Sequence, residues 1–155
     1  MISFDYYGDQ DYNWGEIDYK YDTLANINAM AEEAAGLSTE NKYNAIALFL
    51  KAYYYDYMTR RVGDIPLDES LMAEGENSIQ EPAYDNQEEV YAKILEWLKE
   101  ANTLITTAMT EVETGDLEGD FLYNGDLSKW QKAINSFYLR VLINLSQKAS
   151  ALNVP

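Results

Sequence analysis

Four stretches of this chain carry apolar residues at every third or fourth position, and each stretch is long enough to form an α-helix. They run over about residues 22–35, 39–61, 86–108 and 128–148. This spacing places the apolar side chains on one face of a helix, where a neighbouring helix can cover them. No segment shows the alternating pattern of a half-buried strand. The sequence therefore predicts an all-α chain with about four main helices.

The ends of these stretches carry residues that start and stop helices. Gly36 and Gly63 are predicted to end the first two helices, because glycine readily adopts the backbone conformation found after a helix. The predicted N-terminal caps are Asp22, the pair Asp85 and Glu88, and the pair Ser128 and Gln131. Tyr84 and Tyr123 each precede a helix by a few residues, and we interpret both as staples that fix the entry angle of the chain.

The order of the segments is helix, short turn, helix, long loop at 63–85, helix, acidic loop, helix. Two helical hairpins packed side by side would bury the apolar faces against each other, as in a helical solenoid. A strict tetratricopeptide repeat is not visible, and a four-helix bundle fits the same pattern. We expect a single helical domain over 1–155, with an irregular aromatic and acidic segment at 1–21 and helical hairpins at 22–155.

The charge excludes several classes of partner. The chain has 27 acidic and 11 basic residues, which gives a net charge of −16. Nucleic acids and anionic lipid surfaces would repel such a chain. It also has no cysteine, so disulfides and thiolate metal sites are excluded. No apolar run approaches the ~18 residues that span a bilayer, and the first residues lack the basic start and apolar stretch of a signal peptide.

Catalytic and metal sites are weakly indicated. The chain has no histidine, and no motif singles out any pair of carboxylates as a general acid and base, so we predict no enzyme and no cofactor. Asp9, Asp11 and Asn13 resemble the start of an EF-hand calcium loop, but Trp14 and Lys20 stand where that loop needs glycine and glutamate. The acidic loop around Gly119, with Asp116, Glu118 and Asp120, offers only an unspecific cation site, so no metal site is predicted.

Aromatic residues are the remaining resource for binding. Tyr6, Tyr7, Asn13 and Trp14 lie where no helical stripe requires them. Flat rings beside amide and carboxylate groups suit a carbohydrate, because a sugar stacks its apolar face on a ring while its hydroxyls form hydrogen bonds. The alternative is that these rings pack onto the helices. We take these four residues as the candidate substrate-binding site.

Four blocks of sequence, in a fixed order, resemble the SusD/RagB family of Bacteroidetes outer-membrane lipoproteins, and more closely its SusD-like branch. The blocks span nearly the whole chain: 14–26, which begins with Trp14 and continues through Tyr19 and Tyr21; 43–67, which begins Tyr-Asn-Ala-Ile-Ala and ends Gly-Asp-Ile-Pro-Leu; 84–91; and 123–140. Each block alone is weak, but their order and spacing make a fairly specific pattern.

The resemblance implies a tetratricopeptide-like scaffold within a SusD-like fold. It also implies a non-enzymatic protein that binds a glycan, or sometimes a peptide, at the outer face of the outer membrane. Members of the family pair with a SusC-like TonB-dependent transporter, which they cover like a lid. The prototype carries ligand-binding aromatics on loops before its early helices, which correspond by position to Tyr6, Tyr7, Asn13 and Trp14.

Two departures qualify the resemblance. Family members are typically several times longer, so we expect this chain to be an N-terminal fragment that holds about two hairpins. The lipoprotein signal and anchoring cysteine are absent from this chain. The prediction is a cell-surface nutrient-binding protein that partners a TonB-dependent transporter. The alternative is a helical-repeat scaffold that binds only other proteins and has no small-molecule ligand.

Overall fold

The computed structural model describes residues 20–73, 78–110 and 115–148. These residues form four α-helices: α1 (Tyr21–Glu33), α2 (Glu40–Val62), α3 (Gln87–Thr110) and α4 (Leu127–Asn144). A short 3-10 turn, η2 (Ser146–Lys148), follows α4. The described residues contain no strand, only an isolated antiparallel bridge between Ile65 and Asp85. The predicted all-α class and the four predicted helices are confirmed, with each boundary within about two residues except at the C-terminal end of α4.

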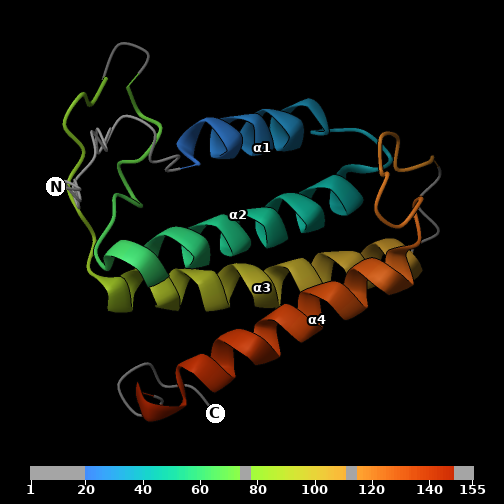
Figure 1. The fold of residues 1–155 in the computed structure, drawn as a ribbon. Coiled ribbons are helices and arrows are strands. Elements are labelled where there is room, and N and C mark those ends of the chain that lie inside the picture. The colour runs from blue at the N-terminus through green and yellow to red at the C-terminus, as the bar shows by residue number, and fades with distance from the viewer. Residues whose placement is uncertain (1–19, 74–77, 111–114, 149–155) are drawn as a thin grey trace, which may run out of the picture.

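The helices lie in sequence order as an antiparallel row, with α1 and α4 at its two edges (Figure 1). The largest interface joins α2 to α3, and smaller ones join α1 to α2 and α3 to α4. The backbone of α1 makes no close contact with α3 or α4. In a closed four-helix bundle the first and last helices would touch other members on two sides. The structure therefore has the arrangement of two stacked hairpins, as in tetratricopeptide-like scaffolds.

The core lies between these helices and uses the predicted stripes. Ala45 and Ala52 of α2 and Ala101 of α3 are fully buried, and such small side chains let two helix axes come close. The largest fully buried apolar side chains are Leu24, Val90, Ile94, Leu98, Ile105, Ile134 and Val141. Phe49 of α2 reaches across to α4, where its ring packs edge-on against Trp130 and Phe137 at centroid distances of 6.0 and 5.7 Å.

The first two helices end close to the predicted glycines, but the first helix begins differently from the prediction. Gly63 is the C-terminal cap of α2, with φ 84°, and Gly36 has φ 77° in the turn after α1. Asp22 was predicted to cap α1, but it lies inside the first turn of that helix. The residue that precedes α1 is Lys20, in a left-handed conformation and without a side-chain capping bond. Tyr21, predicted to be in the irregular segment, is the first residue of α1.

The caps of α3 and α4 lie one or two residues from their predicted positions. The capping box of α3 is formed by Asn86 and Glu89, because the Asn86 side chain accepts from the Glu89 N–H at 3.0 Å and Glu89 accepts from the Asn86 N–H at 3.2 Å. Asp126 caps α4 by accepting from the Lys129 N–H at 3.1 Å. The predicted pairs Asp85 with Glu88 and Ser128 with Gln131 are therefore wrong as caps. The observed cap of α3, Asn86, lies one residue C-terminal to the predicted Asp85. The observed cap of α4, Asp126, lies two residues N-terminal to the predicted Ser128.

The long loop between α2 and α3 is closed by bonds between its two ends. Ile65 and Asp85 exchange both backbone hydrogen bonds, at 3.1 and 3.2 Å. The Asp85 carboxylate also accepts from the N–H groups of Leu67 and Asp68, at 2.8 and 3.1 Å. The Asp64 carboxylate accepts from the Gln87 N–H at 2.9 Å. The ends of the loop thus hold each other, and this use of Asp85 explains why it does not cap α3.

The two tyrosines that were interpreted as staples have different roles. Tyr123 packs edge-on against Trp130 in the first turn of α4, at a centroid distance of 5.0 Å, which confirms the prediction for this residue. Tyr84 is 73% exposed, so it does not pack against α3 and the prediction is wrong there. Within the described part of the chain, no helix is both long and apolar enough to cross a membrane.

Candidate functional site

The residues predicted to bind substrate lie outside the described residues. Tyr6, Tyr7, Asn13 and Trp14 all fall within 1–19, as do Asp9 and Asp11 of the calcium-loop pattern. Their assignments stay predictions. Three of the hollows that described residues line have volumes of about 570, 220 and 190 Å³, and the largest of these three is the candidate functional site.

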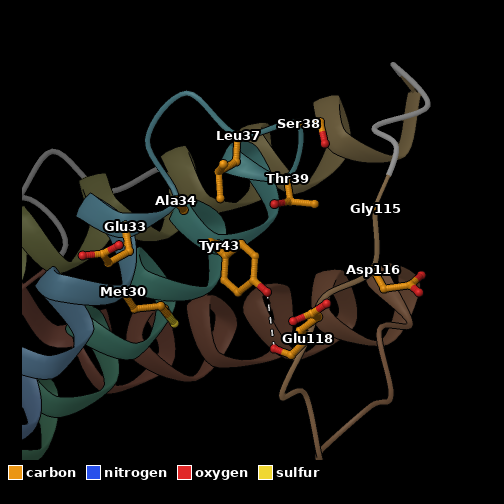
Figure 2. Close-up of a pocket in the computed structure, with 10 residues that line it drawn as sticks. All are labelled: Met30, Glu33, Ala34, Leu37, Ser38, Thr39, Tyr43, Gly115, Asp116 and Glu118. Atoms are coloured by element: carbon orange, nitrogen blue, oxygen red, sulfur yellow. Dashed lines mark hydrogen bonds between the residues drawn. The ribbon is translucent and has the colours of Figure 1, made fainter.

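The largest hollow is an open groove of about 570 Å³ at the end of the molecule where the α1–α2 turn faces the segment that leads to α4. Its volume lies in the range of small-molecule sites, about 300–1,000 Å³. Figure 2 shows Tyr43 in the middle of the groove, with Glu33 and Asp116 on opposite sides. The lining residues are Met30, Glu33, Ala34, Leu37, Ser38, Thr39, Tyr43, Gly115, Asp116 and Glu118.

One wall of this groove is formed by residues 115–118, and hydrogen bonds from α2 hold this wall in place. The Lys42 ammonium donates to the Gly115 carbonyl oxygen at 2.8 Å, and the Tyr43 hydroxyl donates to the Glu118 carbonyl oxygen at 3.3 Å. Gly115 has φ 111° and approaches Thr39 so closely that a Cβ atom would lie 2.9 Å from the Thr39 Cγ2 atom. A residue with a side chain would therefore move this wall away from α2.

The groove combines apolar surface with hydrogen-bond acceptors. Leu37 is 55% exposed, and Met30 and the Tyr43 ring add partly exposed apolar surface. The carboxylates of Glu33, Asp116 and Glu118 supply acceptors that hydroxyl groups can donate to. Nowhere among the described residues do three or more such ligands come together in a way that could hold a metal ion. This chemistry suits a neutral, hydroxyl-rich ligand with an apolar face.

Asp120, a member of the predicted acidic loop, organises the turn that enters α4. Its carboxylate accepts from the N–H groups of Leu122, Tyr123 and Gly125 and from the Trp130 indole N–H, at 2.8 to 3.1 Å. Desolvation acts to raise the pKa of this carboxyl, but the four hydrogen bonds outweigh it and lower the pKa. Its acceptor capacity is therefore used inside the protein.

A second hollow, of about 220 Å³, lies beside the first described residues. Tyr21, Val62, Asp64, Ile65, Pro66 and Tyr84 line it. The Tyr21 hydroxyl donates to the Pro66 carbonyl oxygen at 2.8 Å, and burial is the main cause of the raised pKa of Tyr21. Tyr84 leaves most of its ring open to solvent. Because Tyr21 is the last residue of the predicted aromatic segment at 1–21, this hollow lies close in sequence to the predicted site.

The third hollow, of about 190 Å³, is formed by side chains from α1, α2, α3 and the long loop. Lys51, Asp68 and Trp97 are among its lining residues. Sequence reasoning missed it because its members come from four elements that are distant along the chain. A weak signal exists in the spacing of Lys51 and Tyr55, which both line the hollow and are four residues apart, and so share one face of α2.

Comparisons with known proteins agree with this architecture. A SusD-like family model, described as starch-binding and associating with the outer membrane, matches residues 3–154. An outer membrane protein of Bacteroides vulgatus ATCC 8482, for which a role in nutrient binding has been suggested, is similar in structure with a TM-score of 0.72 and 39% sequence identity. The similarity covers 87% of this chain and 27% of that one.

Two SusD homologues of Bacteroides fragilis NCTC 9343 are also similar, each at 38% identity, with TM-scores of 0.69 and 0.72. They are matched over 82% and 84% of this chain and over 25% and 26% of their own lengths. This chain thus spans about a quarter of the length of these solved structures. None of the curated proteins compared with the chain matches it.

Proposed function

The chain belongs to the SusD-like family, and we propose that it is a non-catalytic nutrient-binding protein of the outer membrane whose ligand is a glycan. The observation that carries this proposal is the family match over 3–154, in a chain whose four helices superimpose on solved SusD homologues. The family description names starch binding, and hydroxyl-rich ligands suit the acceptors and apolar surface of the groove around Tyr43.

We place the main ligand contacts on Tyr6, Tyr7, Asn13 and Trp14, with the groove around Tyr43 as a second contact. Rings such as those of Trp14 and Tyr6 can stack on the apolar faces of sugars, while the Asn13 amide can bond to their hydroxyls. The sequence supports a binding role rather than a catalytic one, because it has no histidine and no motif that singles out a general acid and base.

Calorimetric titration with a panel of oligosaccharides and short peptides tests the ligand. We expect at least one oligosaccharide to bind, Trp14→Ala to weaken it at least tenfold, and Tyr43→Ala to weaken it less. Phe121→Ala is the matched control, since that exposed ring lines neither site, and it should leave the affinity unchanged. Binding of peptides alone would overturn the glycan assignment. Release of smaller sugars from a bound glycan would overturn the non-catalytic role.

The proposed partner is a SusC-like TonB-dependent transporter, with the chain on the outward face of the outer membrane as part of a lipoprotein. The turn at 120–126 supports a docking role. Phe121 is 86% exposed and Leu122 is 57% exposed, yet the hydrogen bonds to Asp120 hold the backbone around them. A large apolar side chain on a pre-organised turn can bind a protein without a large ordering cost.

Co-purification with a co-expressed SusC-like TonB-dependent transporter tests the partnership. We expect a complex with the transporter that Phe121→Ser weakens and that Trp14→Ala leaves intact. For glycan binding we expect the opposite: a change at Trp14 weakens it and a change at Phe121 does not. A complex with the transporter but no binding of any glycan or peptide would favour the alternative, a scaffold that binds only protein. Absence of any complex would contradict the proposed partner.

A further inference from the structure

The hollow between α1, α2, α3 and the long loop has charged and polar walls. It is lined by Leu24, Asn28, Lys51, Tyr55, Leu67, Asp68, Ser70, Leu71 and Trp97, and its volume is about 190 Å³. Since a water molecule in the liquid takes about 30 Å³, this volume holds roughly six waters. That is the scale of a single sugar ring rather than an oligosaccharide.

One wall carries a cation that lacks an acceptor. The Lys51 ammonium forms no hydrogen bond or ion pair with any described residue, and its recorded contact is with the face of Trp97, at 5.1 Å from the ring centroid. Lys93 lies 6.0 Å from the same ring and is paired with Glu96 at 2.9 Å. Desolvation, and then the charge of Lys93, lower the pKa of Lys51, and they outweigh the smaller opposing effect of the Glu100 carboxylate. An anionic group beside Lys51 would relieve both effects.

The other polar residues that line the hollow mainly offer acceptors. The Ser70 hydroxyl donates to the Leu67 carbonyl oxygen at 2.7 Å, so the hydrogen bond of 2.6 Å between Tyr55 and Ser70 uses the Tyr55 proton. Both oxygens therefore keep lone pairs but no free proton. The exposed Asp68 carboxylate makes no hydrogen bond or ion pair with a described residue. A ligand for this wall has to bring several donors.

We propose that this hollow binds one carboxylate-bearing sugar unit, a uronic acid, with its carboxylate on the Lys51 ammonium and its hydroxyls donating to Asp68, Tyr55 and Ser70. The inference rests on the proposed glycan-binding function and names an acidic class of sugar for it. A neutral sugar can offer Lys51 a hydroxyl oxygen as acceptor, but it brings no charge opposite to that of the ammonium. An inorganic anion brings no donors for Asp68, and an amino acid brings a single donor group for a wall that has several acceptors.

The net negative charge of the chain repels an anionic sugar, so binding of a uronic acid depends on Lys51 and Lys93, the two cations near the Trp97 ring. With a net charge of −16, the chain repels anions at long range. Attraction therefore has to come from Lys51, with Lys93 as the second cation near the Trp97 ring. Removing the charge of Lys51 should abolish the preference for the acidic sugar over a neutral one. Removing a lysine elsewhere should lower the affinity for the acidic sugar slightly or leave it unchanged.

NMR titration of the 15N-labelled chain with glucuronate, glucose and alanine tests the inference, with the Trp97 indole N–H as the reporter. We expect glucuronate to shift that signal and to bind at least tenfold more tightly than glucose or alanine. Lys51→Met should weaken glucuronate at least tenfold, and Lys51→Gln should do the same. Lys132→Met, an exposed lysine of α4, is the matched control and should leave the affinity within twofold. Circular dichroism checks that each variant keeps its helices.

Three results would overturn the inference: equal binding of glucose or alanine, unchanged glucuronate binding in both Lys51 variants, or no shift of the Trp97 signal. If neutral oligosaccharides bind in the Trp14-dependent manner described above while glucuronate does not, the inference fails and the proposed function stands. If no saccharide of either kind binds, both fail.

Discussion

The turn that enters α4 depends on Asp120, and Asp120→Asn tests how much. In the native protein one carboxylate oxygen accepts from Leu122 and Tyr123, and the other accepts from Gly125 and the Trp130 indole. An asparagine has one acceptor oxygen, so its NH2 group must face two N–H donors. Trp130 is only 3% exposed, so its indole N–H has little access to replacement water.

The expected loss follows from these contacts. A buried donor that loses its partner costs about 1–3 kcal/mol, and the more exposed backbone donors add less, so we expect a loss of roughly 2–3 kcal/mol. For a chain of this size that corresponds to a fall of about 4–12 °C in Tm. Urea unfolding followed by circular dichroism measures it. Asp116→Asn is the control, because Asp116 is an exposed carboxylate of the same segment.

The same residue predicts a dependence on pH. Because the folded state lowers the pKa of Asp120, its contribution is complete above the pKa of the unfolded chain, about 3.9, and is lost as pH falls through the folded value. The stability of the native chain should therefore fall more steeply between pH 5 and 2 than that of Asp120→Asn. A variant within about 0.5 kcal/mol of the native chain, with the same acid slope, would refute the reasoning, since ordinary surface substitutions stay within that margin.

Three further predictions concern single contacts. Asn86→Ala should lower the free energy of unfolding by about 1 kcal/mol through loss of the α3 cap, whereas Glu88→Gln should change it little. Urea unfolding of both variants measures this, and a larger loss in Glu88→Gln would favour the originally predicted pair, Asp85 and Glu88, as the cap. Burial, and then the nearby Asp56 carboxylate, raise the pKa of Tyr91 to about 12. The neutral Tyr91 side chain therefore contributes fully to the stability of the folded state below about pH 10, the usual tyrosine pKa, and this contribution is lost as pH rises toward 12. In Tyr91→Phe the free energy of unfolding should consequently fall less steeply between pH 10 and 12, as measured by urea unfolding across this range. Gly115→Ala should lower Tm more than Gly119→Ala, because both have positive φ but only Gly115 has a neighbour within 3 Å of the new Cβ; equal losses would mean that the wall contact is unimportant.

The sequence could predict the helices because their determinants are local. The spacing of Val90, Ile94 and Leu98 fixes one buried face of α3, and Gly63 ends α2 wherever its neighbours lie. The choice between a row and a closed bundle could not be predicted from the apolar spacing alone, and it was the resemblance to the SusD/RagB family that predicted the hairpins. The choice depends on which helices meet, and an apolar stripe on α1 does not say which partner covers it.

The caps and the hollows were harder to predict because they depend on distant contacts. Asp85 and Asn86 are both good capping residues, and Asp85 is taken by Leu67 and Asp68 across the loop. The hollow beside Lys51 brings together parts of four elements. Tyr84 looked like Tyr123 in sequence, but only Tyr123 has a tryptophan placed to receive its ring.

The position of α1 at one edge of the row has a consequence for local opening. Because α1 rests mainly on α2, it can detach while the α2–α3 interface stays intact. Amide protons of α1 should then exchange with solvent through small, frequent openings, whereas those of α2 and α3 exchange only when the whole chain unfolds. The hollow that includes Lys51 has one wall on α1, so it would open and refill on the faster of these two timescales.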